Sequence, residues 1–247
     1  MSGELEYHEQ LYSGFAQRHF ARAAVRALRA HMAMRILRVT GAGPGTRLLS
    51  LGCGIGDTEL LLAPRVGEIV GVDFSPAAIA QARQDAARAG LANARFVEGT
   101  AEDAPAGPYD AVVAVFFLHH LPDTELRRLP DRLAALLKPG GVFWSLDPSR
   151  HRLSGAVGNL LVPGLMKKYQ SPGERELVRR ETEALFRAAG FQCRSGFYDF
   201  VSSPLAGLAP GWTWGYRAAR ALDELLIRTP GLRLAGSNFE ISARKPG

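Results

Sequence analysis

The sequence predicts an α/β protein built on a parallel, doubly wound sheet. Between residues 47 and 146, short apolar runs alternate with amphipathic stretches, which is the pattern of strands and helices that follow one another along a chain. Turns that contain glycine or proline separate these runs. The chain has 247 residues, of which 47% are hydrophobic, so it is long enough to bury one core with additions around it.

Residues 7–39 are predicted to be mostly helical and to end at a glycine-rich breaker, 41–45. Apolar side chains recur there at helical spacing: Val25, Leu28, Met32 and Ile36. Arginines form a second stripe: Arg18, Arg22, Arg26 and Arg29. A solvated helix face is the favoured interpretation of the arginines, and contact with a phosphate or with the acidic headgroups of a membrane surface is the alternative.

Five strands and three helices are expected to alternate after this segment. The strands are expected at 47–51, 68–73, 94–98, 110–115 and 142–146. The helices are expected from Thr58, from Ser75-Pro76 to Ala89, and over 125–137. Ser75 suits an N-cap, because its oxygen can accept an early N–H, and Pro76 suits the first turn, where its missing N–H costs nothing.

The pattern changes after Asp147. Residues 149–172 show no regular period, and an irregular segment of this length in a compact domain is typical of a lid or a binding loop. The rest is predicted as a helix over 174–189, a strand over 191–202, an amphipathic helix over 214–227 and a strand over 238–243. Apolar residues gather on one side of the amphipathic helix: Ala218, Leu222 and Leu225.

Composition narrows the class of protein. Cys53 and Cys193 are too few for a disulfide framework or a cysteine metal cluster, and no metal site is predicted. The polar, acidic start indicates no signal peptide, and no apolar run is long enough to cross a bilayer, so we expect a cytoplasmic protein. The net charge of +6 is compatible with an acidic substrate or a membrane surface and does not require nucleic acid.

The most informative segment is the glycine turn after the first predicted strand. Gly52, Gly54 and Gly56 follow an apolar run at alternate positions, and a second apolar run ends at Asp73. A strand, a glycine turn, a helix and a strand tipped by a carboxylate are typical of nucleoside binding. The third glycine comes one residue earlier than in the dinucleotide pattern, and Asp57 at the helix start would repel a pyrophosphate. A cationic or zwitterionic ligand such as S-adenosylmethionine (SAM) would be tolerated there.

Five segments, in order, resemble the motifs of class I SAM-dependent methyltransferases. They are LLSLGCGIG, GVDFSPAAIAQAR, FVEGTAEDAP, YDAVVAVFFLHHLPD and LKPGGVFWSLDP. The resemblance implies a three-layer α/β sandwich with a seven-stranded, mostly parallel sheet whose last strand is antiparallel between strands five and six. Together with the pattern, it divides the chain into an N-terminal helical cap at 1–44 and a methyltransferase domain at 45–247. A lid insertion at about 149–172 and an inserted helix at about 212–229 belong to that domain.

The resemblance also implies which residues hold the cofactor. Backbone at the glycine turn would pass under the methionine part of SAM, Asp73 would hold the ribose hydroxyls, and Phe74 would lie against the adenine. Further contacts are expected at the adenine edge, the sulfonium and the carboxylate. The full set is Tyr12, Gly52, Cys53, Gly54, Gly56, Asp73, Phe74, Thr100, Ala101, Glu102, Val115 and Phe116.

Two positions depart from the pattern of this family. Ser50 stands where relatives have an acid that helps to fix the glycine turn, so weaker SAM binding is expected. Thr100 stands where relatives often have aspartate, so adenine recognition is expected to use Glu102 or Asp103. Neither change removes Asp73, the carboxylate expected at the ribose.

Methyl transfer is an in-line displacement at a carbon that the sulfonium activates, so the protein has to align the reactants and exclude water. A general base is needed if the acceptor holds a proton that must leave early, as a hydroxyl does. His120, in the pair His119-His120 after the fourth strand, is the first candidate, and Asp147 at the tip of the fifth strand is the second. A structural role is the alternative for both residues.

The acceptor is predicted to be a small organic or lipid-like molecule. The chain has no Asn/Asp-Pro-Pro-Tyr motif after strand four, no cysteine placed as the nucleophile of cytosine methylation, and no RNA-binding module. The candidates for an apolar acceptor pocket are the lid residues 149–172, with Met166 and Tyr169, and Phe197, Tyr198, Trp212 and Trp214. The alternatives are a binding protein that has lost catalysis, an NAD-dependent oxidoreductase, and an enzyme that uses SAM for another reaction.

Overall fold

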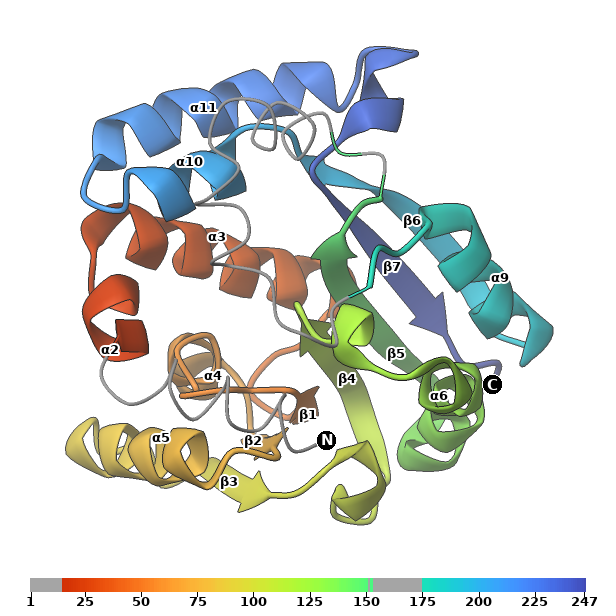
Figure 1. Cartoon of the computed structure of the whole chain (residues 1–247). Coiled ribbons are helices and arrows are strands. Elements are labelled where there is room, and N and C mark those ends of the chain that lie inside the picture. Colours follow the sequence, from red (N-terminus) through yellow and green to blue (C-terminus); the bar gives the residue numbers. More distant parts are fainter. Residues whose placement is uncertain (1–14, 151, 153–174) are drawn as a thin grey trace.

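A computed structural model describes residues 15–150, 152 and 175–247 (Figure 1). Within these residues, seven strands form one sheet in the order β3-β2-β1-β4-β5-β7-β6. The strands are β1 Arg47–Leu51, β2 Glu68–Asp73, β3 Ala94–Glu98, β4 Tyr109–Val115, β5 Leu137–Pro148, β6 Gln192–Asp199 and β7 Asn238–Arg244. β7 is antiparallel to both β5 and β6, and the other pairs are parallel. The predicted sheet is therefore confirmed, including its antiparallel last strand.

Helices cover both faces of the sheet, so the fold has three layers (Figure 1). In the described part of the chain they are α2 Phe15–Phe20, α3 Ala23–Thr40, α4 Glu59–Leu62, α5 Pro76–Arg88, α6 Asp123–Leu136, α9 Arg179–Ala188, α10 Ser202–Leu208 and α11 Thr213–Leu226. Leu48 and Trp144 pack with α3, α4, α10 and α11 on one face. Leu49 and Phe143, one residue away in each strand, pack with α6 and α9 on the other face. This alternation follows from the two-residue period of a strand.

The N-terminal helical segment is divided into two helices. The chain turns at Ala21 and Arg22, and the Ala24 N–H donates to the Pro210 carbonyl at 2.9 Å. Arg18 therefore lies on α2 and the other three arginines on α3, so the single stripe predicted for them is wrong. The apolar stripe of α3 is confirmed by its buried members, Val25, Leu28, Met32 and Ile36. None of the helices among the described residues combines the length and apolar composition of a membrane span.

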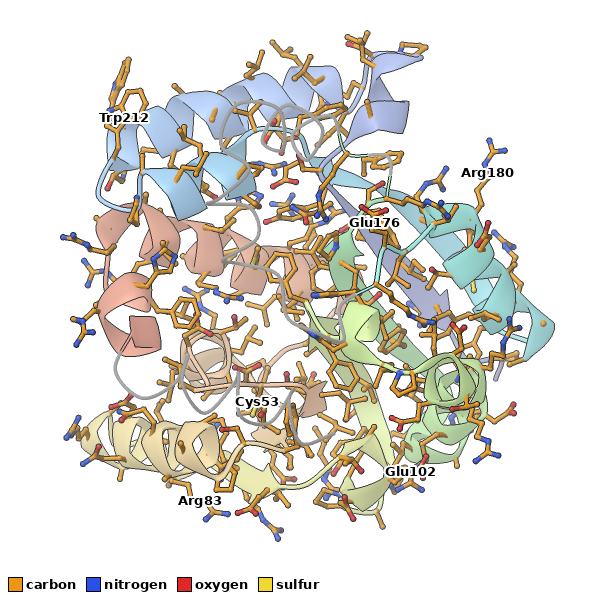
Figure 2. All side chains as sticks on the ribbon, in the orientation of Figure 1. Cys53, Arg83, Glu102, Glu176, Arg180 and Trp212 are labelled. Atoms are coloured by element: carbon orange, nitrogen blue, oxygen red, sulfur yellow. The ribbon has the colours of Figure 1, made fainter. Side chains whose placement is uncertain are left out.

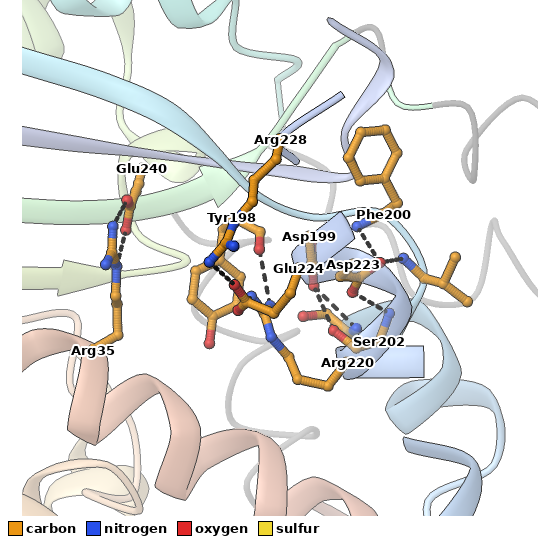
Figure 3. Close-up of polar contacts among 12 residues, drawn as sticks. Arg35, Tyr198, Asp199, Phe200, Ser202, Arg220, Asp223, Glu224, Arg228 and Glu240 are labelled. Atoms are coloured by element: carbon orange, nitrogen blue, oxygen red, sulfur yellow. Dashed lines mark hydrogen bonds and ion pairs between the residues drawn. The ribbon is translucent and has the colours of Figure 1, made fainter. Parts of the chain in front are cut away.

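Polar contacts also hold α3 against the sheet. Arg35 Nε donates to Glu240 Oε2 on β7 at 2.9 Å (Figure 3), and the Trp144 indole N–H donates to the same oxygen at 3.1 Å. The hydrogen bond to Glu240 raises the pKa of the Arg35 guanidinium, so the guanidinium stays charged. α3 thus belongs to a layer of the sandwich, and the division of the chain at residue 44 stays a prediction.

Three predicted boundaries differ from the structure by more than two residues. β5 begins at Leu137 rather than at residue 142, because its pairing with β4 starts there. The helix predicted from residue 174 begins at Arg179, since Leu177 forms a bridge with Ser149. The strand predicted to residue 202 ends at Asp199, and α10, which the pattern did not indicate, follows it.

A buried carboxylate on α11 accounts for the start of α10. Asp223 is fully buried, and it accepts the backbone N–H groups of Phe200, Val201 and Ser202, each at 3.0 Å (Figure 3). The first N–H groups of a helix have no partner within the helix, so a carboxylate at this position stabilises the helix start. The contact spans more than twenty residues of sequence, which is why the local pattern could not indicate it.

The side of α11 that was predicted as its apolar face lies on the surface. Leu222 is 46% and Leu225 is 66% exposed, whereas Tyr216, Ala219 and Asp223 are buried. The helix is turned in this way because the buried Asp223 carboxylate has to reach the start of α10. The amphipathic pattern predicted the existence of the helix correctly, but the side that faces the protein interior is determined by hydrogen bonds to a distant segment.

We expect Asp223→Ala to lower the free energy of unfolding by about 2–4 kcal/mol, because three backbone N–H groups lose their acceptor. Urea unfolding of the variant and the wild type measures the difference. The matched control is Glu224→Ala, which removes the neighbouring, 49% exposed carboxylate of the same helix. The control should cost less than about 1 kcal/mol, since exposed ion pairs contribute little. Equal losses in the two variants would contradict the role of Asp223.

Candidate functional site

The glycine turn joins β1 to α4 and is tied to the end of β2. The N–H groups of Gly52 and Cys53 donate to the Val72 carbonyl at 2.8 and 3.0 Å, and the Gly54 N–H donates to Asp73 Oδ2 at 2.8 Å. Gly52 and Gly54 have φ angles of 67° and 54°, which glycine adopts without strain. The structure thus brings together the turn and the carboxylate that were predicted to share a ligand.

Two glycines of the turn are required by packing within the protein. A Cβ on Gly52 would meet the Phe117 ring, and a Cβ on Gly56 would lie 2.9 Å from the Phe96 ring. The close approach at these positions is therefore made by the protein's own aromatic side chains. Gly52 and Gly56 therefore affect a ligand indirectly, because they allow the backbone of the turn to follow its observed course.

Asp73 stands at the carboxyl end of β2 and is 6% exposed. Its Oδ1 accepts the Ser75 N–H at 3.0 Å, and its Oδ2 accepts the Gly54 N–H at 2.8 Å. A carboxylate offers about four acceptor sites, which suits it to hold protein amides and ligand hydroxyls at once. Phe74 follows directly and is half-buried, at the position where an adenine contact was predicted.

The loop after β3 lies beside Asp73, because the Gly99 N–H donates to the Asp73 carbonyl at 2.9 Å. Asp103 Oδ2 accepts the N–H and the hydroxyl of Thr100, both at 2.8 Å, and these bonds lower the pKa of Asp103. The Glu102 side chain is 72% exposed and forms an ion pair with α6 across 3.8 Å. Both acids expected to recognise the adenine already have partners in the protein, which favours recognition through the backbone of this loop.

The turn also has an acid that the motif pattern did not reveal. Glu59, the first residue of α4, is 3% exposed, and the Ser50 hydroxyl donates to Glu59 Oε1 at 2.6 Å. Burial raises the pKa of Glu59 to about 7. The second oxygen, Oε2, is buried and has no hydrogen-bond partner among the described residues. Ser50 therefore does not leave the turn without an acid, because α4 supplies one.

Arg29 reaches the same turn from α3. Its Nε lies 2.7 Å from Asp57 Oδ2, and its side chain is 15% exposed. The guanidinium carbon lies 5.8 Å from the centre of the Phe116 ring at the end of β4, where Phe116 has a φ of 55°. A positive φ outside glycine stores strain, which is common near functional sites. The solvated face predicted for the arginines is wrong for Arg29 and holds for the exposed Arg18, Arg22 and Arg26.

A cavity of about 480 Å³ opens on the helix side of the turn. Phe20, Ile55 and Leu60 contribute apolar wall, and Arg29 and Asp57 line the cavity as well. A cavity of this volume is within the range of small-molecule sites. The Arg29–Asp57 ion pair thus lies on a surface that a ligand can reach.

Asp147 and His119 form a buried pair where β4 and β5 end. His119 Nδ1 lies 3.0 Å from Asp147 Oδ1, and the two side chains are 4% and 0% exposed. A carboxylate at Nδ1 favours the tautomer that carries its proton there. His120 is half-buried, and the centre of its ring lies 4.0 Å from the centre of the His119 ring. Asp147 Oδ2 has no hydrogen-bond partner among the described residues. The two predicted candidates, His120 and Asp147, are therefore linked through His119, to which no separate role was assigned.

The remaining predicted residues have three different outcomes. Tyr12 and most of the predicted lid, 149–172, lie outside the described residues. Val115 is half-buried at the end of β4. Trp212 and Trp214 are 50% and 74% exposed, and Trp212 projects from the surface near the start of α11 (Figure 2). Both tryptophans lie at the surface, and the apolar pocket predicted from them together with the lid stays a prediction.

The comparisons with known proteins agree with this geometry. A family model described as a methyltransferase domain matches residues 48–141. A Synechocystis protein named as an uncharacterized methyltransferase is 30% identical over 150 residues, which are 60% of this chain and 68% of that protein. Nocamycin O-methyltransferase of Saccharothrix syringae is 30% identical over 216 residues, which are 74% of this chain and 73% of that protein. The chain belongs to the class I SAM-dependent methyltransferases.

A solved structure supports the fold of this methyltransferase over nearly its whole length. Magnesium protoporphyrin IX methyltransferase from Synechocystis, with bound S-adenosylhomocysteine (SAH), has a TM-score of 0.64 at 15% identity. The alignment covers 96% of this chain and 97% of that one. Because the chain belongs to the class I SAM-dependent methyltransferases, SAM is its cofactor, and the alternative of an NAD-dependent oxidoreductase is not supported.

The residues of the methyltransferase fit SAM in charge and in hydrogen bonding. Asp57 and Asp73 outnumber Arg29 at the turn, which suits a ligand with a sulfonium and an ammonium group. Glu59 Oε2 is a buried acceptor that receives no hydrogen bond from the described part of the chain, and an ammonium group carries three donors. Both observations agree with the methionine end of SAM at the turn.

The raised pKa of Glu59 makes the stability of the methyltransferase depend on pH. Folded Glu59 holds its proton up to about pH 7, whereas an ordinary glutamate releases it near 4.5. The stability that the folded protein gains by holding this proton is therefore fully present below pH 4.5, and it is lost as the pH rises through 7. The glutamine of Glu59→Gln does not titrate. As the pH rises from about 5 to about 8, we expect the free energy of unfolding of the wild type to fall by about 2–3 kcal/mol relative to that of the variant. Urea unfolding at the two pH values measures this fall, and a difference that does not change with pH would contradict it.

Proposed function

We propose that this methyltransferase moves the methyl group of SAM to a hydroxyl oxygen of a small organic acceptor. The observation that carries the proposal is the buried Asp147–His119 pair at the carboxyl ends of β4 and β5, with the His120 ring beside it. A hydroxyl acceptor needs a group that takes its proton, whereas an acceptor without such a proton does not. A histidine held by a buried aspartate therefore favours methylation of oxygen.

Bound SAM supplies a methyl group on a positively charged sulfur, which needs no further activation. The proposed contacts of this chain are Gly52, Cys53, Gly54, Gly56, Asp73, Phe74, Thr100, Ala101, Glu102, Val115 and Phe116. Arg29 joins them as the counter-ion of the methionine carboxylate, because its guanidinium lines the cavity beside the turn. A guanidinium is suited to a carboxylate by its fork of N–H donors.

His120 is proposed as the base, with Asp147 and His119 as positioning residues. Asp147 orients the His119 ring through Nδ1. Because the centres of the His119 and His120 rings lie 4.0 Å apart, the packing of the two rings restricts the orientation of His120. His120 is half-buried and His119 is buried, which makes His120 the more accessible imidazole. His120 takes the proton of the acceptor hydroxyl as its oxygen attacks the methyl group.

The relatives support a small organic acceptor more strongly than RNA. Nocamycin O-methyltransferase is named for oxygen methylation and aligns over 73% of its own length. A 23S rRNA uracil methyltransferase of Xylella fastidiosa is 46% identical, but the match spans 65 residues and 15% of that protein. A match of that extent supports no conclusion about the acceptor.

Transfer of an isotopically labelled methyl group tests the proposal. The protein is incubated with methyl-labelled SAM and an extract of its host, and the labelled product is found by mass spectrometry. We expect a labelled small molecule that carries an O-methyl group. Labelled RNA or labelled protein would contradict the acceptor class. SAM consumption without a labelled product, or tight SAM binding without turnover, would favour the alternatives of another SAM reaction or a binding protein.

The proposal also includes contact with an acidic membrane surface, through one corner of the molecule. Trp214 is 74% and Trp212 50% exposed, their ring centres lie 6.2 Å apart, and the Trp212 ring is packed over Gly215. Tryptophan beside basic side chains is typical of surfaces that lie among lipid headgroups. The α2–α3 corner adjoins this surface, since α3 is hydrogen-bonded to the α10–α11 loop. It carries the exposed Arg18, Arg22 and Arg26.

Sedimentation with lipid vesicles tests this contact. We expect the protein to bind vesicles that contain phosphatidylglycerol and not vesicles of pure phosphatidylcholine. The triple variant Arg18→Gln/Arg22→Gln/Arg26→Gln should lose this binding. The matched control removes three exposed arginines of α6 and α9, as Arg127→Gln/Arg128→Gln/Arg180→Gln, and should still bind. Equal loss in both variants would contradict a specific surface, and so would a dimer formed through the tryptophans.

A further inference from the structure

Glu59 places a carboxylate where the strand provides a serine. Ser50 lies two residues before Gly52, is 1% exposed, and donates its hydroxyl to Glu59 Oε1 at 2.6 Å. Serine is too short to present a carboxylate itself, but its hydroxyl fixes the position of one that arrives from α4. The Ser50–Glu59 pair therefore acts as one unit in which β1 gives the hydrogen bond and α4 gives the charge.

The second oxygen of Glu59 is buried inside the protein. Glu59 is 3% exposed, and Oε2 has no hydrogen-bond partner among the described residues. Leaving a buried carboxylate oxygen unpaired is unfavourable, so such an atom calls for an explanation. The nearby guanidinium of Arg29 is paired with Asp57 instead, at 2.7 Å. A ligand that brings its own cationic N–H groups would supply the missing donor.

SAM has two positively charged groups, and they differ in hydrogen bonding. The sulfonium has no hydrogen on its charged atom, whereas the ammonium of the methionine end carries three N–H donors. An oxygen that lacks a donor is complementary to the ammonium and gains only a charge interaction from the sulfonium. Hydrogen bonds between an ionised donor and an ionised acceptor are also among the stronger ones in proteins.

We infer that Glu59, held by Ser50, binds the ammonium group of the methionine end of SAM through Oε2. The SAM-binding acid of this protein is thus supplied by the helix α4 and not by the strand β1. The inference rests on SAM as the cofactor and is independent of which acceptor is methylated.

Binding of two nucleosides, measured by calorimetry, tests the inference without turnover. SAH keeps the ammonium and lacks the sulfonium, and 5′-methylthioadenosine keeps the nucleoside and lacks the whole amino-acid end. We expect Glu59→Gln to weaken SAH binding by about 10- to 100-fold and to leave methylthioadenosine binding unchanged. The double variant Ser50→Asp/Glu59→Gln returns an acid to the strand and should restore SAH binding to within about threefold of the wild type.

Glu68→Gln is the control, because it removes an acid at the opposite end of β2 that is paired with Arg47. The control should bind both nucleosides as the wild type does. A Glu59→Gln variant with unchanged SAH affinity would overturn the inference. An equal loss for SAH and methylthioadenosine would also overturn it, since Glu59 would then only shape the turn. A wild-type protein that binds neither nucleoside would instead show that the cofactor assignment is at fault, and the two failures are therefore distinguishable.

Discussion

Asp73→Asn should weaken the binding of SAH by about 100-fold or more. We propose that this carboxylate accepts both ribose hydroxyls, and hydrogen bonds to a charged acceptor contribute about 1.5–3 kcal/mol each. An asparagine of the same size offers one acceptor oxygen and an amide that donates. It would also present a donor to either the Gly54 or the Ser75 N–H, which Asp73 now accepts at 2.8 and 3.0 Å. Isothermal titration with SAH measures the loss.

The control for Asp73→Asn has to be an acid with a similar structural task. Asp110→Asn meets this need, because Asp110 accepts the Arg47 N–H at 2.8 Å and Lys138 Nζ at 2.6 Å, at the other end of the parallel strands. The control should lose stability and keep its SAH affinity. Thermal unfolding without ligand shows whether the Asp73 variant is folded. A folded Asp73→Asn protein that binds SAH like the wild type would show that the ribose is held elsewhere.

The strands around the glycine turn could be predicted from sequence alone, and the reason is local. β1, β2 and β3 have the predicted bounds because each is a short apolar run that ends at a glycine or an acid. β5 could not be bounded in this way, since its extra length depends on pairing with β4 and with the distant β7. The side of α11 that faces the interior also could not be predicted from the sequence, because it depends on the hydrogen bonds of Asp223 to residues 200–202.

The same distinction between local patterns and long-range contacts applies to the residues of the candidate site. The glycines and Asp73 follow from spacing within one strand–turn–helix–strand unit, and the structure brings them together. Arg29 beside Asp57 and His119 beside Asp147 are pairs between separate elements, for which the sequence holds no distance information. Glu59 is an intermediate case. Its sequence signal was an acid at the head of an otherwise apolar helix, nine residues after a serine that replaces an acid.

Asp147→Asn should lower kcat by about 100-fold while leaving SAH affinity within about twofold of the wild type. We propose that this residue lies on the acceptor side, and general-base catalysis contributes about 10²–10⁴-fold to the rate. Asparagine can present its amide N–H to His119 Nδ1, which favours the opposite tautomer and turns the ring. His120→Gln should show the same pattern, as the base itself is removed. A loss of SAH binding in either variant would contradict their place on the acceptor side.

Ser145→Ala is the matched control for Asp147→Asn. Ser145 lies two residues earlier on β5, is fully buried, and has an Oγ without a hydrogen-bond partner among the described residues. Its replacement should change neither kcat nor SAH affinity. His119→Gln then separates the two possible roles of the pair. If His119 only positions His120, His119→Gln should retain more activity than His120→Gln. If His119→Gln is the more damaging change, the proton is taken by His119 itself, and Asp147 then acts directly on the base.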